Sequence, residues 1–432
     1  MATRFIVLAN YERKTLGMPE LPYAIVPYPM SGVSTDEAKG RALAVLDVVV
    51  KALTTAQIPT NAAAAPAVVR AEVATVVDLD EKSFESINEV FYKLRWTDGL
   101  PVVPPTRAKV EAFLAYSDLE PGTVLGVMAP AWEPTTVHHV AVNSVMAGCR
   151  PEYFPVVIAG IQAMLDSTLN LYGVQATTNP AGVMLLVNGP IAKELDINGG
   201  GNLFGQGWRA NGTIGRAVRL CMINIGGGRP GEGYMSTLGS PNKWGSCIGE
   251  NEILSPWPAF HVERGFDAAT STVTAVATAA PQNVIEMSAD PIAILNTLSR
   301  ALTSAGSNCT LFDHQPMIVI APVPARQLAD GGFDKAAIRK YLWEHGKFEL
   351  GGYHPTSQKT IREWKASCRH IEDGREVIYP TRTPEDIGIV VGGGDSGPHS
   401  AILATFNGTQ LVTRAITFRD GTPVLSVEDF RT

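Results

Sequence analysis

One stretch of the sequence, residues 240–263, combines a thiol with several ionisable side chains. The thiol belongs to Cys247, which directly follows Gly245 and Ser246. The thiolate is the nucleophilic form of cysteine, and a helix N-terminus or the nearby Lys243 would favour it by lowering the pKa of the thiol. Cys247 is therefore a candidate nucleophile. The structural alternative is a buried, unreactive cysteine, which is the usual fate of a free thiol.

Two pairs of ionisable side chains follow this thiol. Glu250 and Glu252 are separated by one residue, as are His261 and Glu263. At this spacing, two side chains point to the same side of an extended chain, so each pair predicts an acid/base site or a metal site. We favour acid/base chemistry, because the sequence contains no motif with metal-ligand spacing. The structural alternative is a solvated surface or a set of ion pairs with arginine.

A second candidate nucleophile, Cys149, lies in a break between two predicted helices, over residues 134–147 and 152–165. Apolar residues recur at helical spacing in both segments, and residues 148–151 interrupt the pattern. Arg150 and the start of the second helix would favour the thiolate by electrostatic attraction. Close packing at a tight helix junction selects the same small residues, and that interpretation stays open.

Glycine-rich loops supply the candidate binding groups. Residues 198–207 and 392–399 contain many glycines, which let backbone amides approach an anionic ligand. Neither loop ends in the Gly-Lys-Ser/Thr of a phosphate-binding loop, and the second lacks the GxSxG pattern of serine hydrolases. Arg414 would either clamp a carboxylate or form a structural ion pair. The candidate substrate-binding residues are Asn188, Asn198, Asn211, Asp395, Ser396, His399 and Arg414.

An internal repeat indicates the fold that positions these groups. Residues 184–195 align with residues 317–328, and each copy reads as a buried strand, a short helix, a glycine turn and a longer helix. A third unit, residues 386–406, reads as a strand, a glycine loop and a helix or short turn. The sequence therefore predicts an α/β protein with a large pseudo-symmetric core of repeated strand–helix units. Clefts between related halves are common ligand sites.

The N-terminal segment predicts half of a small α/β domain. Residues 5–8 and 23–26 are short apolar runs typical of strands, and residues 35–53 carry helical periodicity. Residues 15–30, with the sequence TLGMPELPYAIVPYPM, resemble the C-terminal half of the UGSC-like domain. This resemblance extends over residues 5–54.

The resemblance implies a partner. The family is named for a selenocysteine or cysteine followed by Gly-Ser-Cys, and that motif lies in the half of the domain that this chain does not contain. A separate small subunit would supply that half. The alternatives are a decayed domain that serves as a docking appendage, and a sequence that begins partway through the domain. From Trp96 to the end, the chain resembles the long uncharacterised domain that often follows UGSC-like domains in bacterial proteins.

These patterns divide the chain into four parts. Residues 1–56 form the half-domain, and the alanine-rich residues 57–82 are typical of a linker. Residues 83–300 and 301–432 are the first and second α/β repeat regions.

Composition excludes several classes of protein. The chain has 432 residues, of which 45% are hydrophobic and 18% charged, with a net charge of −7, so it is globular and unsuited to bind nucleic acid. Its apolar runs are too short to cross a membrane, and a cytoplasmic location is expected. Five widely spaced cysteines without a CxxC pair argue against a disulfide framework and a structural zinc site.

The expected function is that of a lyase or hydratase acting on a small, polar, anionic substrate. Glu250, Glu252 or His261 would move a proton, and Cys247 or Cys149 would act as nucleophile or acid. No cofactor fingerprint occurs, and no cofactor is expected. The chain would be the large subunit of a homo- or hetero-oligomer. The alternatives are a thiol redox enzyme, a non-catalytic subunit and a metal-dependent hydrolase.

Overall fold

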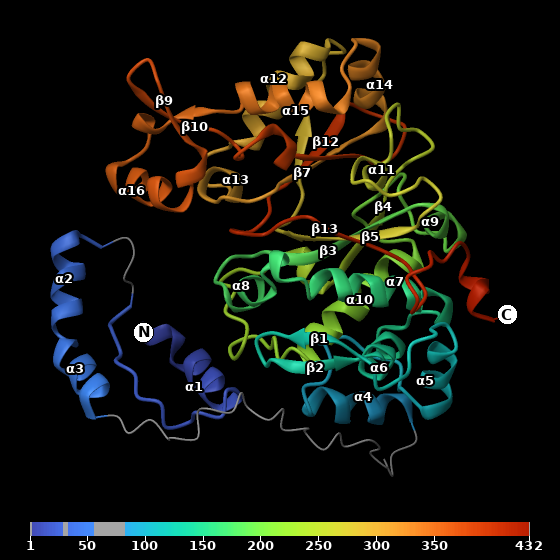
Figure 1. Cartoon of the computed structure of the whole chain (residues 1–432), viewed down its shortest axis with the longest axis horizontal. Coiled ribbons are helices and arrows are strands. Elements are labelled where there is room, and N and C mark those ends of the chain that lie inside the picture. Colours follow the sequence, from blue (N-terminus) through green and yellow to red (C-terminus); the bar gives the residue numbers. More distant parts are fainter. Residues whose placement is uncertain (1, 29–32, 56–82, 432) are drawn as a thin grey trace.

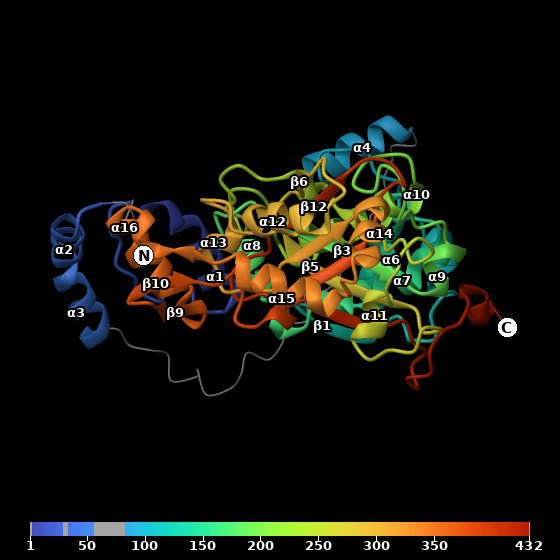
Figure 2. The ribbon, with the colours of Figure 1, turned by 90° about the horizontal axis from the view of Figure 1, so that it is seen from above.

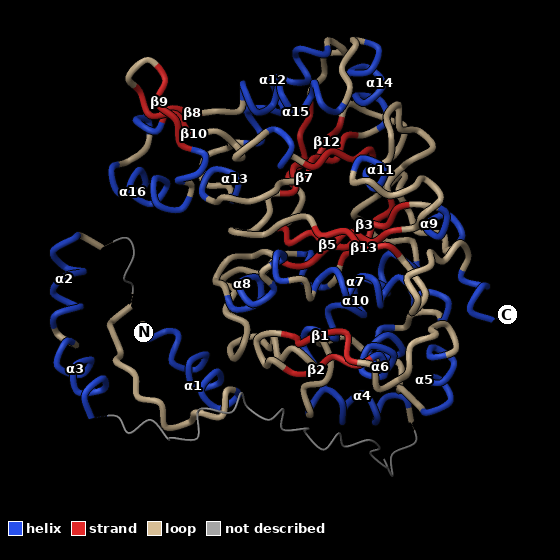
Figure 3. Tube along the Cα trace, viewed as in Figure 1, coloured by secondary structure: helices blue, strands red, loops and turns tan. Residues whose placement is uncertain are grey.

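Two β-sheets stacked between two layers of helices form the body of the protein (Figure 1). The computed structural model describes residues 2–28, 33–55 and 83–431. Coloured by secondary structure, the layers run helix, sheet, sheet, helix (Figure 3). The molecule is thus an α/β protein with mixed sheets, as the sequence predicts.

The first sheet has the strand order β13-β5-β3-β4. Its central strand β3 is parallel to β4 and antiparallel to β5. The strands are β3 (Gly182–Asn188), β4 (Ser246–Gly249), β5 (Thr272–Thr278) and β13 (Val412–Ala415). Every residue of β3 and β5 is buried, because the sheet is covered on both faces.

The second sheet repeats this arrangement, with the order β6-β12-β7-β11. Its central strand β7 is parallel to β11 and antiparallel to β12. The strands are β6 (Gln282–Ile285), β7 (Met317–Ile320), β11 (Gly388–Val391) and β12 (His399–Leu403). The predicted repeat is confirmed, since a short and then a longer helix follow both β3 and β7. These helices are α9 (Pro190–Glu194) and α10 (Arg209–Asn224) in one half, and α14 (Pro322–Asp330) and α15 (Lys335–His345) in the other.

The third unit, residues 386–406, differs from the prediction in its last element. The glycine loop after β11 leads into strand β12, not into a helix. The residues after the loop, His399–Leu403, pair with both β7 and β6, so tertiary pairing decides their conformation.

The core is continuous between the two sheets. Met184 and Leu186 of β3 pack with Val319 of β7 and Val390 of β11 in one buried cluster. The outer face of the first sheet is covered by α7 (Phe154–Met164) and α10, and α6 (Val137–Ala147) packs against α10. This confirms the two helices predicted around Cys149. The outer face of the second sheet is covered by α12 (Pro291–Leu302), α14 and α15.

The sheets divide the chain differently from the expected boundary at residue 300. That residue lies inside α12, whereas the change from the first sheet to the second falls between β5 and β6. Strand β13 then returns to the first sheet after the second is complete. The expected linker, residues 57–82, lies outside the described residues.

The N-terminal segment is helical where a strand was expected. Residues 5–8 lie in a short 3₁₀ turn and the start of α1 (Ile6–Thr15), and residues 23–26 contribute only an isolated bridge between Val26 and Ala2. A run of four apolar residues fits a strand or a helix equally well, so the pattern alone could not decide. Helices α2 (Thr35–Leu43) and α3 (Leu46–Thr55) match the predicted helix over residues 35–53. They lie at one end of the molecule, away from the layered core, in both Figure 1 and Figure 2.

Smaller elements complete the body. A two-stranded ribbon lies below the first sheet, and a three-stranded sheet with one helix lies beside the second (Figure 1). The ribbon consists of β1 (Val124–Met128) and β2 (Glu133–Thr136). The three-stranded sheet consists of β8 (Phe348–Glu349), β10 (Arg375–Ile378) and β9 (Arg369–Glu372), and its helix is α16 (Pro355–Trp364). The other short helices are α4 (Phe84–Lys93), α5 (Arg107–Leu114), α8 (Leu171–Ala176), α11 (Phe260–Glu263) and α13 (Asn308–Leu311).

No single described helix has the length and apolarity needed to cross a bilayer. One bent pair of helical segments, Pro151–Met164 with Ser167–Ala176, meets the requirement only together, and α7 within it is part of the buried core.

Candidate functional site

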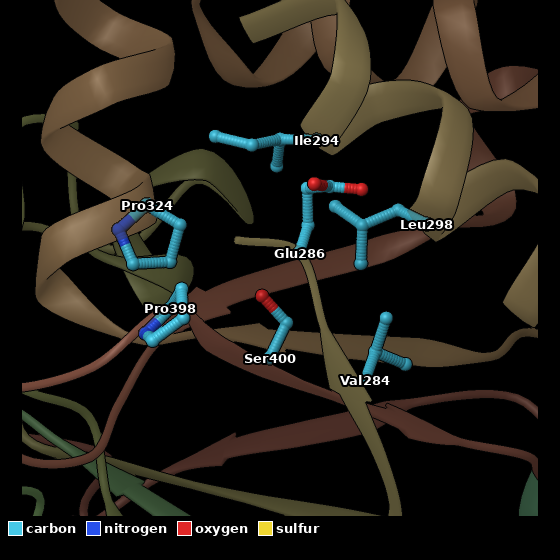
Figure 4. Close-up of a pocket in the computed structure, with 7 residues that line it drawn as sticks. All are labelled: Val284, Glu286, Ile294, Leu298, Pro324, Pro398 and Ser400. Atoms are coloured by element: carbon cyan, nitrogen blue, oxygen red, sulfur yellow. The ribbon is translucent and has the colours of Figure 1, made fainter. Parts of the chain in front are cut away.

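A small cavity lies in the second half, between α12, α14 and the edge of the sheet (Figure 4). Its volume is about 10 Å³, and its lining is mostly apolar, with Glu286 and Ser400 as the polar exceptions. The carboxylate of Glu286 accepts hydrogen bonds from Thr297 Oγ1 and the Ser288 amide, at 2.5 and 2.8 Å. A space of this size holds one water molecule at most, so it is not a substrate site.

A much larger cavity, of about 1170 Å³, lies in the first half. Its walls come from the end of α4, residues 95–98, the last turns of α10 and the loop over residues 229–244. Exposed Leu238 and Trp244 stand among its lining residues. The volume suits a small organic molecule.

Two glycines position one wall of this cavity. A Cβ atom on Gly215 of α10 would lie 2.4 Å from the Ser246 nitrogen, and one on Gly245 would lie 2.4 Å from the Gly215 carbonyl carbon. Gly245 also has a φ of +107°, which glycine adopts without strain. The helix and the short 3₁₀ turn Pro241–Trp244 therefore meet backbone to backbone, which brings Lys243 beside the last turns of α10.

Three side chains form the polar centre of the cavity. The Arg219 guanidinium carbon lies 4.7 Å from the Tyr234 ring centroid, and Lys243 Nζ lies 4.0 Å from the same centroid. Arg219 and Tyr234 are each only 6% exposed. Within the described residues, the Tyr234 hydroxyl is buried without a hydrogen-bond partner. The amine of Lys243 donates to the Ala181 carbonyl oxygen at 2.6 Å.

Burial weakens the proton affinity of both basic groups. Desolvation, followed by the nearby charge of Arg219, lowers the pKa of Lys243 to about 7. Desolvation also lowers the pKa of Arg219 to about 10, although Asp98 opposes the shift. Lys243 can therefore exchange a proton near neutral pH, while Arg219 stays charged.

The cavity has an excess of positive charge. Asp98 is its acidic lining residue, and Arg216 already binds both carboxylate oxygens of Asp98, at 2.7 and 2.8 Å. Arg95 forms an ion pair with Glu232. In the part of the chain that the structure describes, no carboxylate forms an ion pair with Arg219, Arg229 or Lys243. The basic lining residues are Lys93, Arg95, Arg219, Arg229 and Lys243. Such a cavity favours an anion.

The N-terminal segment contacts a glycine loop beside this cavity. A Cβ atom on Gly227, which has a φ of +67°, would lie 2.0 Å from the Tyr11 hydroxyl of α1. Glu12 accepts a hydrogen bond from the Trp132 indole at 3.3 Å. Helix α1 therefore packs behind the loop that carries Arg229.

The predicted carboxylate pair, Glu250 and Glu252, does come together. Asn188 Nδ2 donates to Glu250 at 2.5 Å and to Glu252 at 3.0 Å. Glu250 also accepts from the Phe260 and Val391 amides, and its Oε1 lies 3.7 Å from Lys335 Nζ. Burial raises the pKa of Glu250, although Lys335 and the hydrogen bonds oppose this. Because Val391 and Lys335 belong to the second half, Glu250 ties the two halves together.

The expectation for His261 and Glu263 needs correction. They lie in the one-turn helix α11, not in an extended chain, so their side chains do not share a side. His261 is fully buried, and neither ring nitrogen has a hydrogen-bond partner among the described residues. Glu263 forms ion pairs with Lys335 and Arg339, each at 2.9 Å.

Both candidate thiols lie in the first half, where Cys247 is buried and Cys149 is half-buried. Cys247 lies in β4 and is 3% exposed, and burial raises the pKa of its thiol. Burial likewise raises the pKa of Cys149 to about 12, although Thr213 and Arg216 oppose the shift. Arg150, expected to favour the Cys149 thiolate, forms an ion pair with Glu152 at 2.5 Å. The protonated thiol is therefore the stable form of both cysteines near neutral pH.

The predicted binding residues are spread over several places. The Asn211 side chain accepts a hydrogen bond from the Asn198 amide at 2.8 Å and donates to the Asn198 carbonyl at 3.0 Å. Asn211 Nδ2 also donates to the Cys247 carbonyl at 3.0 Å. The two predicted glycine loops meet, since the Gly393 amide donates to the Gly199 carbonyl at 2.9 Å.

The remaining predicted groups lie near the surface. Asp395 pairs with Arg326 at 2.6 Å, His399 Nδ1 lies 3.1 Å from Asn283 Oδ1, and neighbouring Ser396 is exposed. Arg414 forms an ion pair with Asp166, so of its two expected roles it has the structural ion pair and not the carboxylate clamp. None of the predicted site residues lines the large cavity.

The centre of the large cavity was not predicted from the sequence. The sequence feature that could have indicated it is the run of glycines over residues 226–233, which surrounds Arg229 and precedes Tyr234. Arg219 gives no separate signal, because a single arginine within an amphipathic helix usually faces solvent. In the described part of the chain, no group of three or more His, Cys, Asp or Glu side chains is arranged to hold a metal ion.

Comparison with known proteins places only the first segment. No curated protein and no solved structure matches the chain. The UGSC family matches residues 1–55, which confirms the resemblance of residues 5–54. The chain therefore carries a UGSC-like segment at its N-terminus, ahead of the layered α/β body.

Proposed function

We propose that the protein is an enzyme of the lyase or hydratase type that acts on a small carboxylate in the large cavity. Lys243 is the group that moves the proton. The observation that carries this proposal is the half-buried amine of Lys243, with a pKa of about 7, beside the buried cation of Arg219 in a cavity with excess positive charge.

The chemistry follows from the positions of three groups. The guanidinium groups of Arg219 and Arg229 would hold the substrate carboxylate, since arginine binds carboxylates through two parallel hydrogen bonds. The neutral amine of Lys243 would take a proton from the carbon next to that carboxylate. The Tyr234 hydroxyl would donate a proton to the departing oxygen.

The carboxylates and thiols expected to do this work have another role in the proposal. Glu250 has hydrogen-bond partners for both oxygens and lies in the contact between the two halves. Cys247 belongs to the core of the first half. We therefore assign these residues to holding the fold that presents the cavity.

Proton exchange tests the proposal. The protein would be incubated in deuterated water with a panel of small hydroxy and unsaturated carboxylates, and the loss of carbon-bound proton signals would be followed by NMR. Lys243→Arg keeps the charge but cannot lose the proton, so exchange should fall by about 100-fold or more. Lys109→Arg, an exposed residue of α5 outside the cavity, is the matched control and should exchange normally. Equal exchange rates in wild type and Lys243→Arg would refute the proposal.

We also propose that the UGSC-like segment binds a smaller partner subunit. Apolar side chains of α2 and α3 are exposed, with Leu43 at 67% and Leu53 at 81%. Exposed apolar side chains on one short element are typical of a protein interface.

A further inference from the structure

The polar centre of the large cavity combines an amine with a carboxylate-binding group at short range. Lys243 Nζ and the Arg219 guanidinium contact the same Tyr234 ring, at 4.0 and 4.7 Å from its centroid. The two cationic groups are therefore no further apart than these two distances together. A ligand that binds Arg219 through a carboxylate and reacts with the Lys243 amine must therefore carry these two groups close together.

Lys243 is held so that a neutral amine keeps its lone pair free. Its N–H donates to the Ala181 carbonyl oxygen at 2.6 Å, and this hydrogen bond survives loss of the third proton. Burial and the adjacent Arg219 cation both favour the neutral amine. A desolvated lysine next to a second cation is the arrangement that makes an amine nucleophilic near neutral pH.

A proton donor lies in the same place. Tyr234 lines the cavity, and its hydroxyl is buried without a hydrogen-bond partner among the described residues. An unpartnered buried hydroxyl is costly, and a ligand oxygen in the cavity would satisfy it.

From these positions we propose that the cavity binds a 2-oxo acid, whose carbonyl carbon Lys243 attacks to form a Schiff base. This goes beyond the proposed function, because it gives the same amine a nucleophilic role toward a second class of acid. The lone pair of Nζ forms the new C–N bond, and the carbonyl oxygen takes one of the two protons of the attacking amine and becomes a hydroxyl. That hydroxyl takes a proton from Tyr234 and leaves as water, while the nitrogen loses a proton to restore the tyrosine once the C=N bond has formed. No oxidant or reductant is consumed.

The position of the carboxylate selects this class over simple ketones and aldehydes. In a 2-oxo acid the carboxylate is bonded directly to the carbonyl carbon. Arg219 and Arg229 would hold the carboxylate while the carbonyl faces the amine. A neutral ketone would lack this orientation and react slowly.

Reductive trapping tests the inference on the full chain. The protein would be treated with pyruvate, 2-oxobutyrate or 2-oxoglutarate and sodium cyanoborohydride, and its intact mass and modified peptide determined by mass spectrometry. We expect one reduced adduct on Lys243, formed at least about tenfold faster with pyruvate than with acetone. Arg229→Met should reduce this preference, whereas Lys109→Arg should leave it unchanged.

Other outcomes overturn the inference. Adducts that persist at the same rate in Lys243→Arg would assign the reaction to surface lysines. No adduct from any of the three 2-oxo acids would exclude the Schiff base. If Lys243→Arg still abolished proton exchange in that case, the proposed acid/base function would stand without it. Unchanged thermal unfolding of Lys243→Arg would establish that the variant is folded.

Discussion

Gly215 of α10 and Gly245 lie backbone against backbone, with no room for a Cβ atom on either residue. This contact fixes where the turn that carries Lys243 meets the helix that carries Arg219. One turn of helix separates Gly215 from Arg219, so the contact and the guanidinium lie on the same face of α10. The position of the proposed catalytic amine thus depends on two residues without side chains.

Gly215→Ala should therefore destabilise the protein by about 1–3 kcal/mol, since the added methyl group forces the backbone of residues 245–246 away. Gly212→Ala is the matched control, because a Cβ atom at that position of α10 has nothing within 4 Å. There alanine should be neutral or stabilise by about 0.5–1 kcal/mol through its helix propensity. Urea unfolding of both variants measures the difference, and equal stabilities would contradict the predicted contact.

Lys335 should be essential to the contact between the two halves. Its amine is 3% exposed and lies near the buried carboxylate of Glu250 and against Glu263. Lys335→Met leaves Glu250 without its cation and should cost about 3–5 kcal/mol at neutral pH. The double variant Glu250→Gln/Lys335→Met removes both charges and should recover part of that loss in thermal or urea unfolding. A double variant less stable than the sum of its single variants would contradict the pairing.

Glu250 should also give stability a measurable pH dependence. Burial raises the pKa of its carboxyl in the folded protein above the ordinary 4.5. The folded state then holds this proton more tightly than the unfolded state. The resulting stabilisation is present at low pH and is lost as pH rises through the folded pKa. Relative to Glu250→Gln, the free energy of unfolding of wild type should fall as pH increases from about 4.5. A difference that stays flat or rises with pH would disprove the raised pKa.

Arg219 should set the proton affinity of Lys243. Its charge is the second cause, after burial, that lowers the Lys243 pKa to about 7. Arg219→Gln removes this repulsion, so the Lys243 pKa should rise. Lysine side chains labelled by ¹³C reductive methylation would be titrated by NMR, with Lys243→Arg identifying the resonance. Arg264→Gln is a control, because Arg264 is also a partly buried arginine but binds the Leu411 carbonyl outside the cavity. A Lys243 titration that is the same in all variants would rule out the coupling.

The partner subunit should bind through α2 and α3. Native mass spectrometry of the protein from its own host should find a smaller second chain in fixed ratio. Leu43→Glu/Leu53→Glu should release that chain without changing the thermal unfolding of the body, because both side chains are exposed. Lys39→Glu, a charge change on α2 at a polar exposed residue, serves as the control and should retain the partner. A homo-oligomer that the double variant leaves intact would contradict this interface.

The repeat could be predicted because both copies contain the same local pattern of apolar residues. The two strands of the alignment, near Met184 and Met317, are buried along their whole length, and such strands read as continuous apolar runs. The strand at residues 5–8 was wrong because four apolar residues carry no period that separates strand from helix. The helix expected after the loop at residues 392–398 was wrong because β12 is decided by its neighbours on both sides.

The site was harder to predict than the fold. The proximity of Glu250 and Glu252 follows from their spacing, and Asn188 joins them as a neighbour along the parallel strands β3 and β4. In contrast, Arg219, Tyr234 and Lys243 are brought together by the meeting of a helix, a loop and a turn. The glycine contacts between α10 and the turn allow these two elements to meet this closely. The spacing of these residues along the sequence does not predict that the three elements meet.

The return of β13 to the first sheet has a consequence for how the protein is made. A ribosome releases the chain from its N-terminus, so β3, β4 and β5 emerge well before β13, with the entire second sheet between them. Until β13 pairs with β5, that edge of the first sheet offers unpaired backbone groups to any passing strand. Assembly of the first half must therefore wait until Val412–Ala415 have been synthesised. The nascent chain is most exposed to aggregation during that interval.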